Sequence, residues 1–394
     1  MSVDAREHGA RPEHYVADEA SFARLLEAVA AADRIALDTE SNGFHAYFEK
    51  VCLVQVATAE ADWALDLFAV PFAPLVPLLA DARREVVLHA AEYDVLCLKR
   101  DHGLTFGNIF DTHAAAKVLG LPRVGLGSLL EDELEVRLTA DEQRSDWGKR
   151  PLSAAQLEYA YADVRWLLPL GEKLGRILAE RGRIAEARAE FARLIAKQPR
   201  ERQFDPEGWQ RMKAARTLDA RGRAVLRALY LFRDQRAREL DRPAFKVLGD
   251  LFLAETARRL PKGESDLAGV PGASAHVVRK LGPGVLEAVR EGMSADPPAR
   301  ARPQGRREGK PWAPPPPEVE ERYERLRKWR KQRAGARGVE VQVIAPNAVL
   351  MAVAQRAPGD LETLAQVSGM DEFRLRQYGT EMLEALRAPA ETVG

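Results

Sequence analysis

Short apolar runs alternate with helical patterns along the first 180 residues of the chain. In residues 21–32, apolar side chains recur every three or four positions, which predicts a helix with one buried side. Runs of mainly apolar residues predict strands near 34–39, 50–57, 62–67, 85–89 and 107–111. Further helices are expected at 71–80, 93–102, 112–119, 126–134 and 153–180. Three early strands followed by alternating helices and strands predict an α/β domain, with a mixed sheet and helices on both of its faces.

A different pattern begins near residue 200, where helical segments repeat at a fixed offset of 97 residues. The segment 232–237 (FRDQRA) aligns with 329–334 (WRKQRA), and matches at the same offset continue to Glu287 and Glu384. Such a register predicts a duplicated, all-helical module. Between the copies, residues 293–317 are rich in Pro and Arg and poor in large aliphatic residues, which predicts an extended linker.

Composition narrows the class of protein. A chain of 394 residues predicts two or three domains. Only two cysteines occur, which is typical of a reducing compartment, and charged residues interrupt any apolar leader at the start of the chain. No apolar stretch approaches the length of a membrane span. We therefore expect a soluble, cytoplasmic protein with no membrane partner, and no obligate protein partner is evident.

The net charge is zero, but the charges are divided unevenly. Residues 1–170 hold 28 acidic and 16 basic side chains, a balance of −12, so the remainder holds +12. An acidic first part suits metal binding, and a basic second part suits a polyanionic partner. Two independently solvated surfaces, or an Arg-rich genomic composition, are the alternatives.

Four carboxylates and a tyrosine occur near the ends of predicted elements. Asp38 and Glu40 end a strand on the same side of it, where two carboxylates repel each other unless a cation lies between them. Asp94 lies in a first helical turn, and Tyr159 and Asp163 share a helix face at i and i+4. Taken alone, each motif also has an ordinary structural explanation: a solvated strand end, an acid at a helix dipole, or a tyrosine packed under a surface acid.

Together the three motifs resemble the DEDD superfamily of 3′-to-5′ exonucleases, in the subgroup with tyrosine in the last motif. The resemblance covers roughly residues 15 to 200, and its later part is similar to ribonuclease D in particular. That part comprises Gln143, Ser145, Asp146, Trp147, Arg150, Pro151, Leu152, Gln156, Tyr159, Ala160, Asp163 and Val164. The resemblance implies a ribonuclease-H-like mixed sheet flanked by helices, with residues 1–200 as the catalytic domain.

The resemblance also implies a chemistry. It implies a metal-dependent 3′-to-5′ exoribonuclease that releases nucleoside 5′-monophosphates and trims 3′ ends of tRNA precursors and other stable RNAs. Oxygen ligands without a Cys/His cluster favour two Mg²⁺ or Mn²⁺ ions. By this resemblance Asp38 bridges both ions, and Glu40 and Asp163 bind the ion that activates water. Asp94 then supports the second ion, and Tyr159 orients or deprotonates the attacking water.

The helical copies resemble HRDC domains, small all-α bundles that commonly assist nucleic-acid binding, at 208–292 and 318–389. Tentative RNA contacts, for which a solvated charged face is the alternative, are Arg325, Lys328, Arg330, Lys331, Gln143, Trp147 and Arg150. Phe44 and Phe48 follow the first motif, in a region that the resemblance implies faces the terminal nucleotide, and core packing is an equal alternative for them.

Two other functions compete with an exoribonuclease. A DNA 3′-to-5′ exonuclease would use the same acids, because sugar preference depends on details of the pocket. A catalytically inert RNA-binding scaffold would have no use for a complete set of clustered acids.

Overall fold

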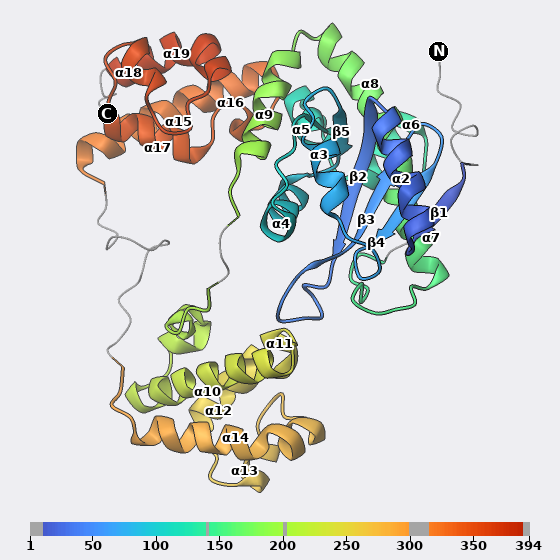
Figure 1. Ribbon diagram of the computed structural model, residues 1–394. Coiled ribbons are helices and arrows are strands. Elements are labelled where there is room, and N and C mark those ends of the chain that lie inside the picture. Colours follow the sequence, from blue (N-terminus) through green and yellow to red (C-terminus); the bar gives the residue numbers. More distant parts are fainter. Residues whose placement is uncertain (1–10, 139–141, 200–202, 299–314, 389–394) are drawn as a thin grey trace. The chain divides into compact units, whose positions relative to one another are not determined.

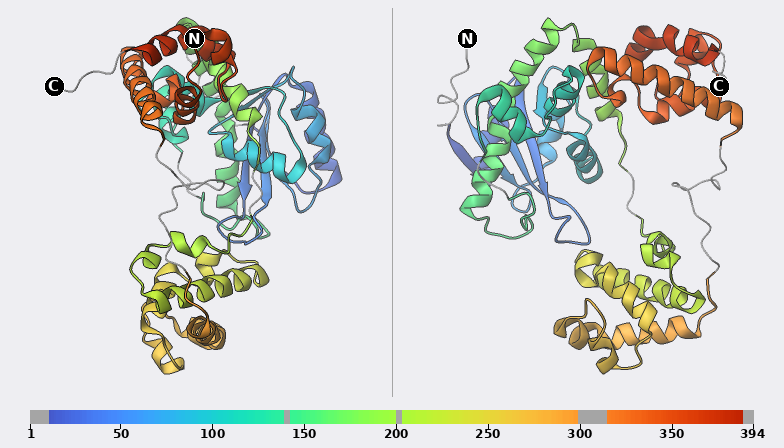
Figure 2. Two further views of the ribbon diagram at one scale, coloured as in Figure 1. Left: turned by 90° about the vertical axis from the view of Figure 1, so that its left-hand side faces the viewer. Right: turned by 180° about the vertical axis from the view of Figure 1, so that it is seen from behind.

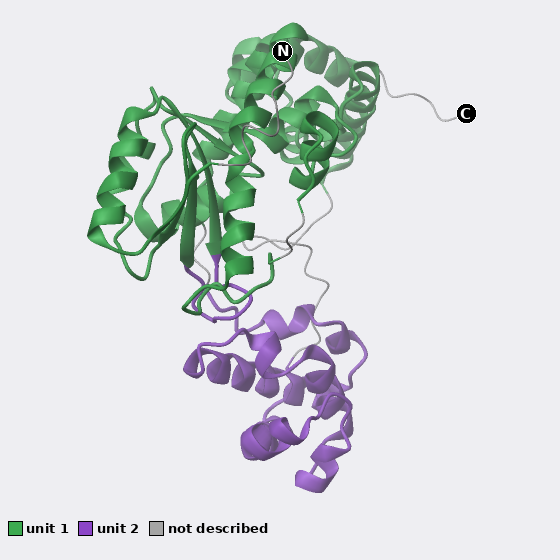
Figure 3. Ribbon diagram, turned by 90° about the vertical axis from the view of Figure 1, so that its right-hand side faces the viewer, with its two compact units in different colours: residues 1–40, 51–199, 313–394 green, residues 41–50, 200–312 purple. Residues whose placement is uncertain are grey.

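The computed structural model describes residues 11–138, 142–199, 203–298 and 315–388. Most of the predicted linker, residues 299–314, therefore lies outside the described residues. By its internal contacts the chain divides into two compact units, coloured separately in Figure 3. The first comprises residues 1–40, 51–199 and 313–394, and the second comprises residues 41–50 and 200–312.

A six-stranded mixed sheet forms the centre of the first unit (Figure 1). Its spatial order is β1-β4-β3-β2-β5-β6. The strands are β1 (Glu13–Val16), β2 (Arg34–Ser41), β3 (Val51–Ala57), β4 (Asp62–Asp66), β5 (Glu85–Leu88) and β6 (Ile109–Asp111). Strand β3 runs antiparallel to β4, whereas β5 runs parallel to both β2 and β6. Every residue of β3 is buried, as expected for a strand covered on both faces.

The predicted mixed sheet is confirmed, and its first strand was missed. Strand β1 has only four residues, and its sequence, EHYV, shows no apolar alternation. It pairs in parallel with β4, with Val16 opposite Leu65, and forms one edge of the sheet. Short polar strands of this kind depend on the neighbouring strand for their conformation rather than on their own residues.

Helices pack against this sheet, and three of them begin at a side-chain N-cap, which is Asp18, Asp111 or Ser153. The helices of the domain are α2 (Glu19–Ala31), α3 (Val76–Leu79), α4 (Glu92–His102), α5 (Thr112–Leu119), α6 (Leu126–Leu134), α7 (Ala154–Arg165), α8 (Leu167–Glu180) and α9 (Ile184–Ala196). Helix α7 packs on β3 and β4, while α9 packs on β6. The helix predicted at 153–180 is divided at Trp166, which ends α7 and precedes α8. The segment 71–80 forms only a short 3₁₀ turn, Ala73–Leu75, followed by α3, since three prolines lie within it.

The two helical copies have the same elements at the predicted offset. The first contains α10 (Ala220–Glu239), α11 (Ala244–Val247), α12 (Asp250–Arg259), α13 (Glu264–Ala268) and α14 (Ala275–Ser294). The second contains α15 (Pro317–Arg337), α16 (Val341–Ile344), α17 (Asn347–Arg356), α18 (Leu361–Ala365) and α19 (Glu372–Arg387). Helices α11, α12, α13 and α14 each start 97 residues before their counterparts. Two short 3₁₀ turns, Gly208–Arg211 and Lys213–Arg216, precede the first copy.

The second copy packs against the sheet domain within the first unit. Val343 of α16 belongs to the same apolar core as the sheet, and helix α19 contacts α9. Both views of Figure 2 show the second copy, in orange and red, beside the green helices that follow the sheet. At this contact a Cβ on Gly120 would come within 2.1 Å of the carbonyl oxygen of Gly338, so only glycine permits the approach.

Candidate active site

Three carboxylates converge at one end of strand β2. Asp38 and Glu40 alternate with Thr39 on β2 and therefore project to the same side, as the sequence predicts. Asp163 reaches them from α7. One carboxylate oxygen from each of the three residues lies within 4.8 Å of those from the other two. The sequence motifs of a strand and of a helix more than 120 residues away thus form a single acidic cluster.

The electrostatics of this cluster favour a bound cation. Burial raises the pKa of Asp38 to about 6. Burial and the charge of Asp38 raise the pKa of Asp163 to about 8. Burial, followed by the charges of Asp38, Asp163 and Asp94, raises the pKa of Glu40 to about 10. When ionised, these buried carboxylates repel one another and have no ion-pair partner among the described residues, so a divalent cation would stabilise their charged forms.

Tyr159 lies one helical turn before Asp163 and forms a side-chain hydrogen bond with it. Burial, the charge of Asp163 and the charge of Glu40 raise the pKa of the Tyr159 phenol far above its ordinary value. Helix α7 is fixed in place at its start by a capping box, in which Ser153 and Gln156 bond each other's backbone amides. Because its pKa is raised, the phenol of Tyr159 keeps its proton at neutral pH. Its hydrogen bond to Asp163 places it at the acidic cluster.

Asp94 lies beside the three-carboxylate cluster rather than within it. It is 5% exposed, in the first turn of α4, and the hydroxyl of Thr39 donates to it over 2.5 Å. Burial and the charge of Asp38 raise its pKa well above the ordinary value. Thr39 thus connects Asp94 to the strand of the first motif, and this contact was not predicted from the sequence.

Asp111, the last residue of β6, has a positioning role in the structure. Its carboxylate caps α5 by accepting from the amide of Ala114 over 3.0 Å. It also accepts from the amides of Ala90 and Ala91, over 3.2 and 2.8 Å, in the turn immediately before α4. Because Ala90 has a left-handed φ of 56°, this turn depends on external hydrogen bonds. Asp111 therefore holds the start of the helix that carries Asp94.

The predicted contacts around residues 143–150 differ in exposure. Gln143 is exposed. Trp147 is only 1% exposed and packs beside Tyr159, with ring centroids 6.1 Å apart. Arg150 donates to both oxygens of Asp66, over 2.6 and 2.8 Å, and to backbone carbonyls. Trp147 is thus buried in the domain and Arg150 is bonded to Asp66, while contact of either residue with RNA stays a prediction.

The four predicted cations of the second helical copy also divide into two pairs. Lys328 and Lys331 are exposed. Arg330 is 5% exposed and donates to the carbonyl of Ala345 and the side chain of Asn347. Arg325 donates to the carbonyl of Leu386. Arg330 thus donates to acceptors of its own bundle, as a buried arginine requires, and its contact with RNA stays a prediction. Phe44 and Phe48 are 54% and 58% exposed, so core packing does not apply to them.

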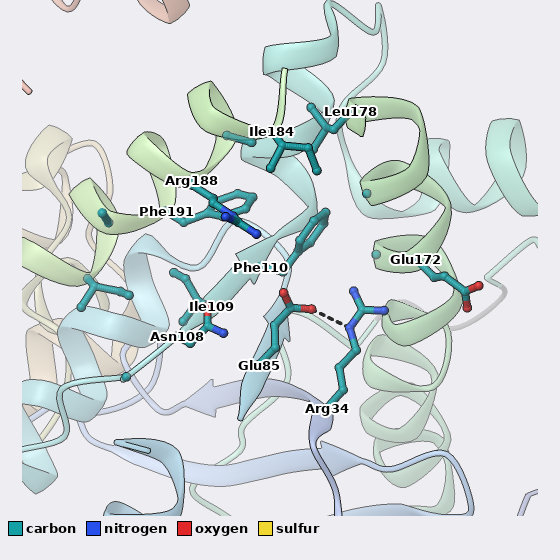
Figure 4. A pocket seen from close by; sticks show the side chains of 16 residues that line it. Arg34, Glu85, Asn108, Ile109, Phe110, Glu172, Leu178, Ile184, Arg188 and Phe191 are labelled. Carbon is teal, nitrogen blue, oxygen red and sulfur yellow. Dashed lines mark hydrogen bonds and ion pairs between the residues drawn. The ribbon is translucent and has the colours of Figure 1, made fainter. Parts of the chain in front are cut away.

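A cavity of about 560 Å³ lies at the other end of the strands (Figure 4). Arg34 and Glu85, the first residues of β2 and β5, line it and are joined by an ion pair of 2.6 Å. The rings of Phe110 and Phe191 supply much of its apolar wall. None of the five predicted catalytic residues, all of which are described, lines this cavity, so it is separate from the acidic cluster.

Comparison with known proteins decides the family. A family model described as 3′-5′ exonuclease matches residues 14–179, and one described as HRDC domain matches residues 222–289 and 319–386. Ribonuclease D of Pseudomonas paraeruginosa is 31% identical over 95% of this chain and 97% of its own length. The chain belongs to the ribonuclease D family. Ribonuclease D of Sphingobium indicum is 33% identical over 66% of this chain and 68% of its own length. The predicted family and enzyme class, a 3′-5′ exonuclease of ribonuclease D type, are confirmed.

Solved structures agree on the fold. Escherichia coli ribonuclease D superposes with a TM-score of 0.63 over 94% of this chain and 98% of its own, at 24% identity. A protein from Bifidobacterium adolescentis gives a TM-score of 0.77 over 95% of this chain and 97% of its own, at 21% identity. The predicted mixed sheet followed by two HRDC regions is thereby confirmed. In the described part of the ribonuclease D chain, no helix combines the length and apolar character that a membrane crossing requires.

Proposed function

We propose that this protein is a divalent-metal-dependent exoribonuclease that removes nucleoside 5′-monophosphates one at a time from RNA 3′ ends. One observation carries the proposal: carboxylate oxygens of Asp38, Glu40 and Asp163 lie within 4.8 Å of one another. Tyr159 adds a side-chain hydrogen bond to Asp163. Membership of a 3′-5′ exonuclease family supports the reaction class. The acidic cluster supports our assignment of the active site.

The residues of the cluster fit hard divalent cations. Three carboxylates supply oxygen ligands, which suit Mg²⁺ and Mn²⁺ and leave positions open for water and substrate. We assign Asp38, Glu40 and Asp163 to direct binding and Asp94 to support of a second ion from its position beside Thr39. Two such ions, when bound, activate the attacking water and stabilise the leaving 3′-oxygen.

We infer that Tyr159 orients the attacking water rather than deprotonating it. Without cations, burial and then the charges of Asp163 and Glu40 raise the pKa of the Tyr159 phenol, so tyrosinate is disfavoured at neutral pH. A protonated phenol beside Asp163 can orient the attacking water through its oxygen. Trp147, packed beside the ring of Tyr159, limits its movement. Loss of the hydroxyl should therefore slow hydrolysis while RNA binding remains.

The substrates that we propose are tRNA precursors and other stable RNAs with 3′ extensions. The E. coli relative is described as an exoribonuclease involved in structured RNA processing, and the paired HRDC regions suit capture of such RNAs. In this role the enzyme would shorten 3′ extensions, and it would recognise the free 3′ end of the RNA.

The test compares matched RNA and DNA strands that carry the same 3′ extension and a 5′ label. With Mg²⁺ or Mn²⁺ the RNA should shorten stepwise, and EDTA should stop the reaction. Asp94→Ala should abolish shortening, while Tyr159→Phe should retain RNA affinity and lose most of the rate. Faster shortening of DNA than of RNA would replace the proposal with a DNA exonuclease. RNA binding with no nucleotide release under any condition would replace it with an inert scaffold.

A further inference from the structure

The two HRDC copies use the same part of the bundle in different ways. This part runs from the end of the long first helix, through the short connection after it, to the four-residue helix that follows. In the second copy it carries Val339 and Val343, which pack into the core of the catalytic domain. The equivalent residues of the first copy, 97 positions earlier, are Arg242 and Lys246, and both are exposed. In the second copy this face is thus covered by the catalytic domain. In the first copy the same face carries two exposed cations.

The same face of the first copy holds the loop that follows Glu40 in the chain. Asp241 accepts from the amides of Tyr47 and Phe48, over 3.0 and 2.9 Å. The phenol of Tyr47 donates to Asp234 over 2.8 Å, and its ring packs on the core of the copy. Residues 41–50 are accordingly part of the second unit (Figure 3). The loop therefore has a defined position on the HRDC bundle.

These contacts bring exposed aromatic rings together with cations. Phe48 and Phe245 are each 58% exposed. Lys246, which adjoins Phe245, lies with its ammonium 3.1 Å from Nδ1 of His45 in the loop. Arg242 follows Asp241, the anchor of the loop, and its side chain has no ion-pair partner among the described residues. Two exposed rings and two exposed cations thus belong to residues at, or next in sequence to, the contact between loop and bundle.

Exposed phenylalanines beside cations match the chemistry of single-stranded nucleic acid. A single exposed ring is ordinary on a protein surface, but two exposed rings next to cations at one contact suit a partner that covers rings and cations together. Bases of single-stranded nucleic acid stack on such rings, while the backbone between them carries phosphates that bind Lys and Arg. A purely apolar protein partner would leave the two cations desolvated and unpaired.

We propose that Phe48, Phe245, Arg242 and Lys246 form a binding surface for single-stranded RNA on the first HRDC copy and its bound loop. Bases stack on the two phenylalanines, and phosphates contact the two cations. This inference rests on the proposed exoribonuclease function and specifies where RNA is held outside the acidic cluster. It also separates the copies: the first binds RNA, and the face of the second that corresponds to it is a structural contact.

The experiment measures binding of a fluorescent, single-stranded 20-nucleotide RNA to the full chain in EDTA, so that no strand is consumed. Phe245→Ala should weaken binding roughly fivefold or more, as expected for loss of one stacked base. Arg242→Gln should lower the dependence of log K on log salt by about 0.7, the value for one phosphate contact on a single strand. Phe245→Ala should leave that salt dependence unchanged. Lys331→Gln removes an exposed cation of the second copy that is itself a predicted RNA contact, and under this proposal it should change neither quantity.

A second readout separates this inference from the proposed function. Hydrolysis of a dinucleotide with Mn²⁺ should be equal in the wild type, Phe245→Ala and Arg242→Gln. Affinities for the 20-nucleotide RNA that are unchanged in both variants, with dinucleotide hydrolysis intact, would overturn the binding surface and leave the exonuclease standing. Absence of dinucleotide hydrolysis in the wild type, with affinities that fall as described, would overturn the exonuclease and leave the surface. A larger effect of Lys331→Gln than of Arg242→Gln would assign RNA to the second copy instead.

Discussion

In the first HRDC copy, Arg233 donates to the carbonyl of Leu248 and to the side chain of Asp250. In the second copy, Arg330 donates to the equivalent carbonyl and to Asn347, each acceptor 97 residues later. The bundles therefore share their internal anchors. They differ at the surface, where Leu240 of the first copy corresponds to Arg337 of the second. Residues inside a repeated bundle specify its fold, and residues on its surface specify what it packs against.

Ion pairs join the second copy to the catalytic domain, and the two that involve α9 are of low exposure. Arg337 contacts both oxygens of Glu186, over 2.8 and 2.5 Å, and Arg374 pairs with Glu190. Lys117 pairs with Glu340 over 3.0 Å at the edge of the same contact. Both Glu186 and Glu190 are on α9, the helix that packs on β6. The second copy thus stabilises the helix layer of the catalytic domain.

The largest expected effect is at Arg337. Arg337→Met leaves Glu186, whose side chain is 3% exposed, with a buried and unpaired charge. We expect a loss of about 3–5 kcal/mol in the free energy of unfolding of the first unit. Leu240→Met, at the equivalent and exposed position of the first copy, should change stability by less than about 0.5 kcal/mol. Urea denaturation followed by hydrogen exchange in α9 and α10 measures both. Equal losses in the two variants would contradict the contrast between the copies.

The next effect is stabilisation of the first unit alone by a divalent cation. Saturation at one hundred times the dissociation constant should add about 2.7 kcal/mol to its free energy of unfolding. Segments of the second unit, such as α12 and α14, should show no change in hydrogen exchange. Stabilisation of both units to the same degree would indicate a cation site outside the acidic cluster.

This stabilisation should depend on pH in a defined direction. The pKa values of Asp38, Asp163 and Glu40 are raised in the folded state, to about 6, 8 and 10. Without a cation, their contribution to stability is complete below the pKa of an unfolded carboxyl and is lost as pH rises through these values. A cation that replaces the protons should therefore stabilise the first unit more at pH 8 than at pH 6. Thermal melts with and without Mg²⁺ measure the difference, and a larger stabilisation at pH 6 would contradict the assigned ligands.

A smaller and symmetric effect is expected for the shared anchors. Arg233→Met and Arg330→Met each leave a buried carbonyl without its donor, which costs about 1–3 kcal/mol. Because the two arginines occupy the same position in the repeat, the losses should agree, each in its own copy. A loss confined to the second copy would show that the bundles differ inside as well as at their surfaces.

The smallest effect concerns the loop on the first copy. Tyr47→Phe removes the hydrogen bond to Asp234 and should release the loop by about 1 kcal/mol. Hydrogen exchange of residues 43–48 should quicken, while α15 stays unchanged. Tyr323→Phe, on α15 of the second copy, is the control and should leave the loop as it is. Unchanged exchange in Tyr47→Phe would mean that the bonds to Asp241 alone hold the loop.

Much of the fold follows from local patterns. Apolar runs located five of the six strands, and the alternation of side chains on β2 placed Asp38 and Glu40 on one side. The i and i+4 spacing likewise placed Tyr159 and Asp163 on one face of α7, where they form a hydrogen bond. These features depend on the periods of strands and helices, which a single sequence displays directly.

Contacts between segments far apart in the sequence could not be predicted from these local patterns. The hydrogen bond from Thr39 to Asp94, and the hold of Asp111 on the turn before α4, join residues that no local period relates. Arg330 resembled its charged neighbours on α15, because nothing in one helix shows which cation meets a carbonyl of another. The repeat held a usable signal: Arg330 aligns with Arg233, whereas Lys331 aligns with Asp234. A charge kept in both copies favours an internal anchor.

The central claim is that Asp38, Glu40, Asp163 and Tyr159 form a cation-dependent site for release of nucleotides from a 3′ end. The most direct measurement is the rate of nucleoside 5′-monophosphate release from a short single-stranded RNA with Mn²⁺. Asp163→Asn is compared with Glu158→Gln, an exposed acid on the same helix. The account predicts release at the wild-type rate in Glu158→Gln and a loss of at least about a hundredfold in Asp163→Asn. Equal rates of release in the two variants would contradict it.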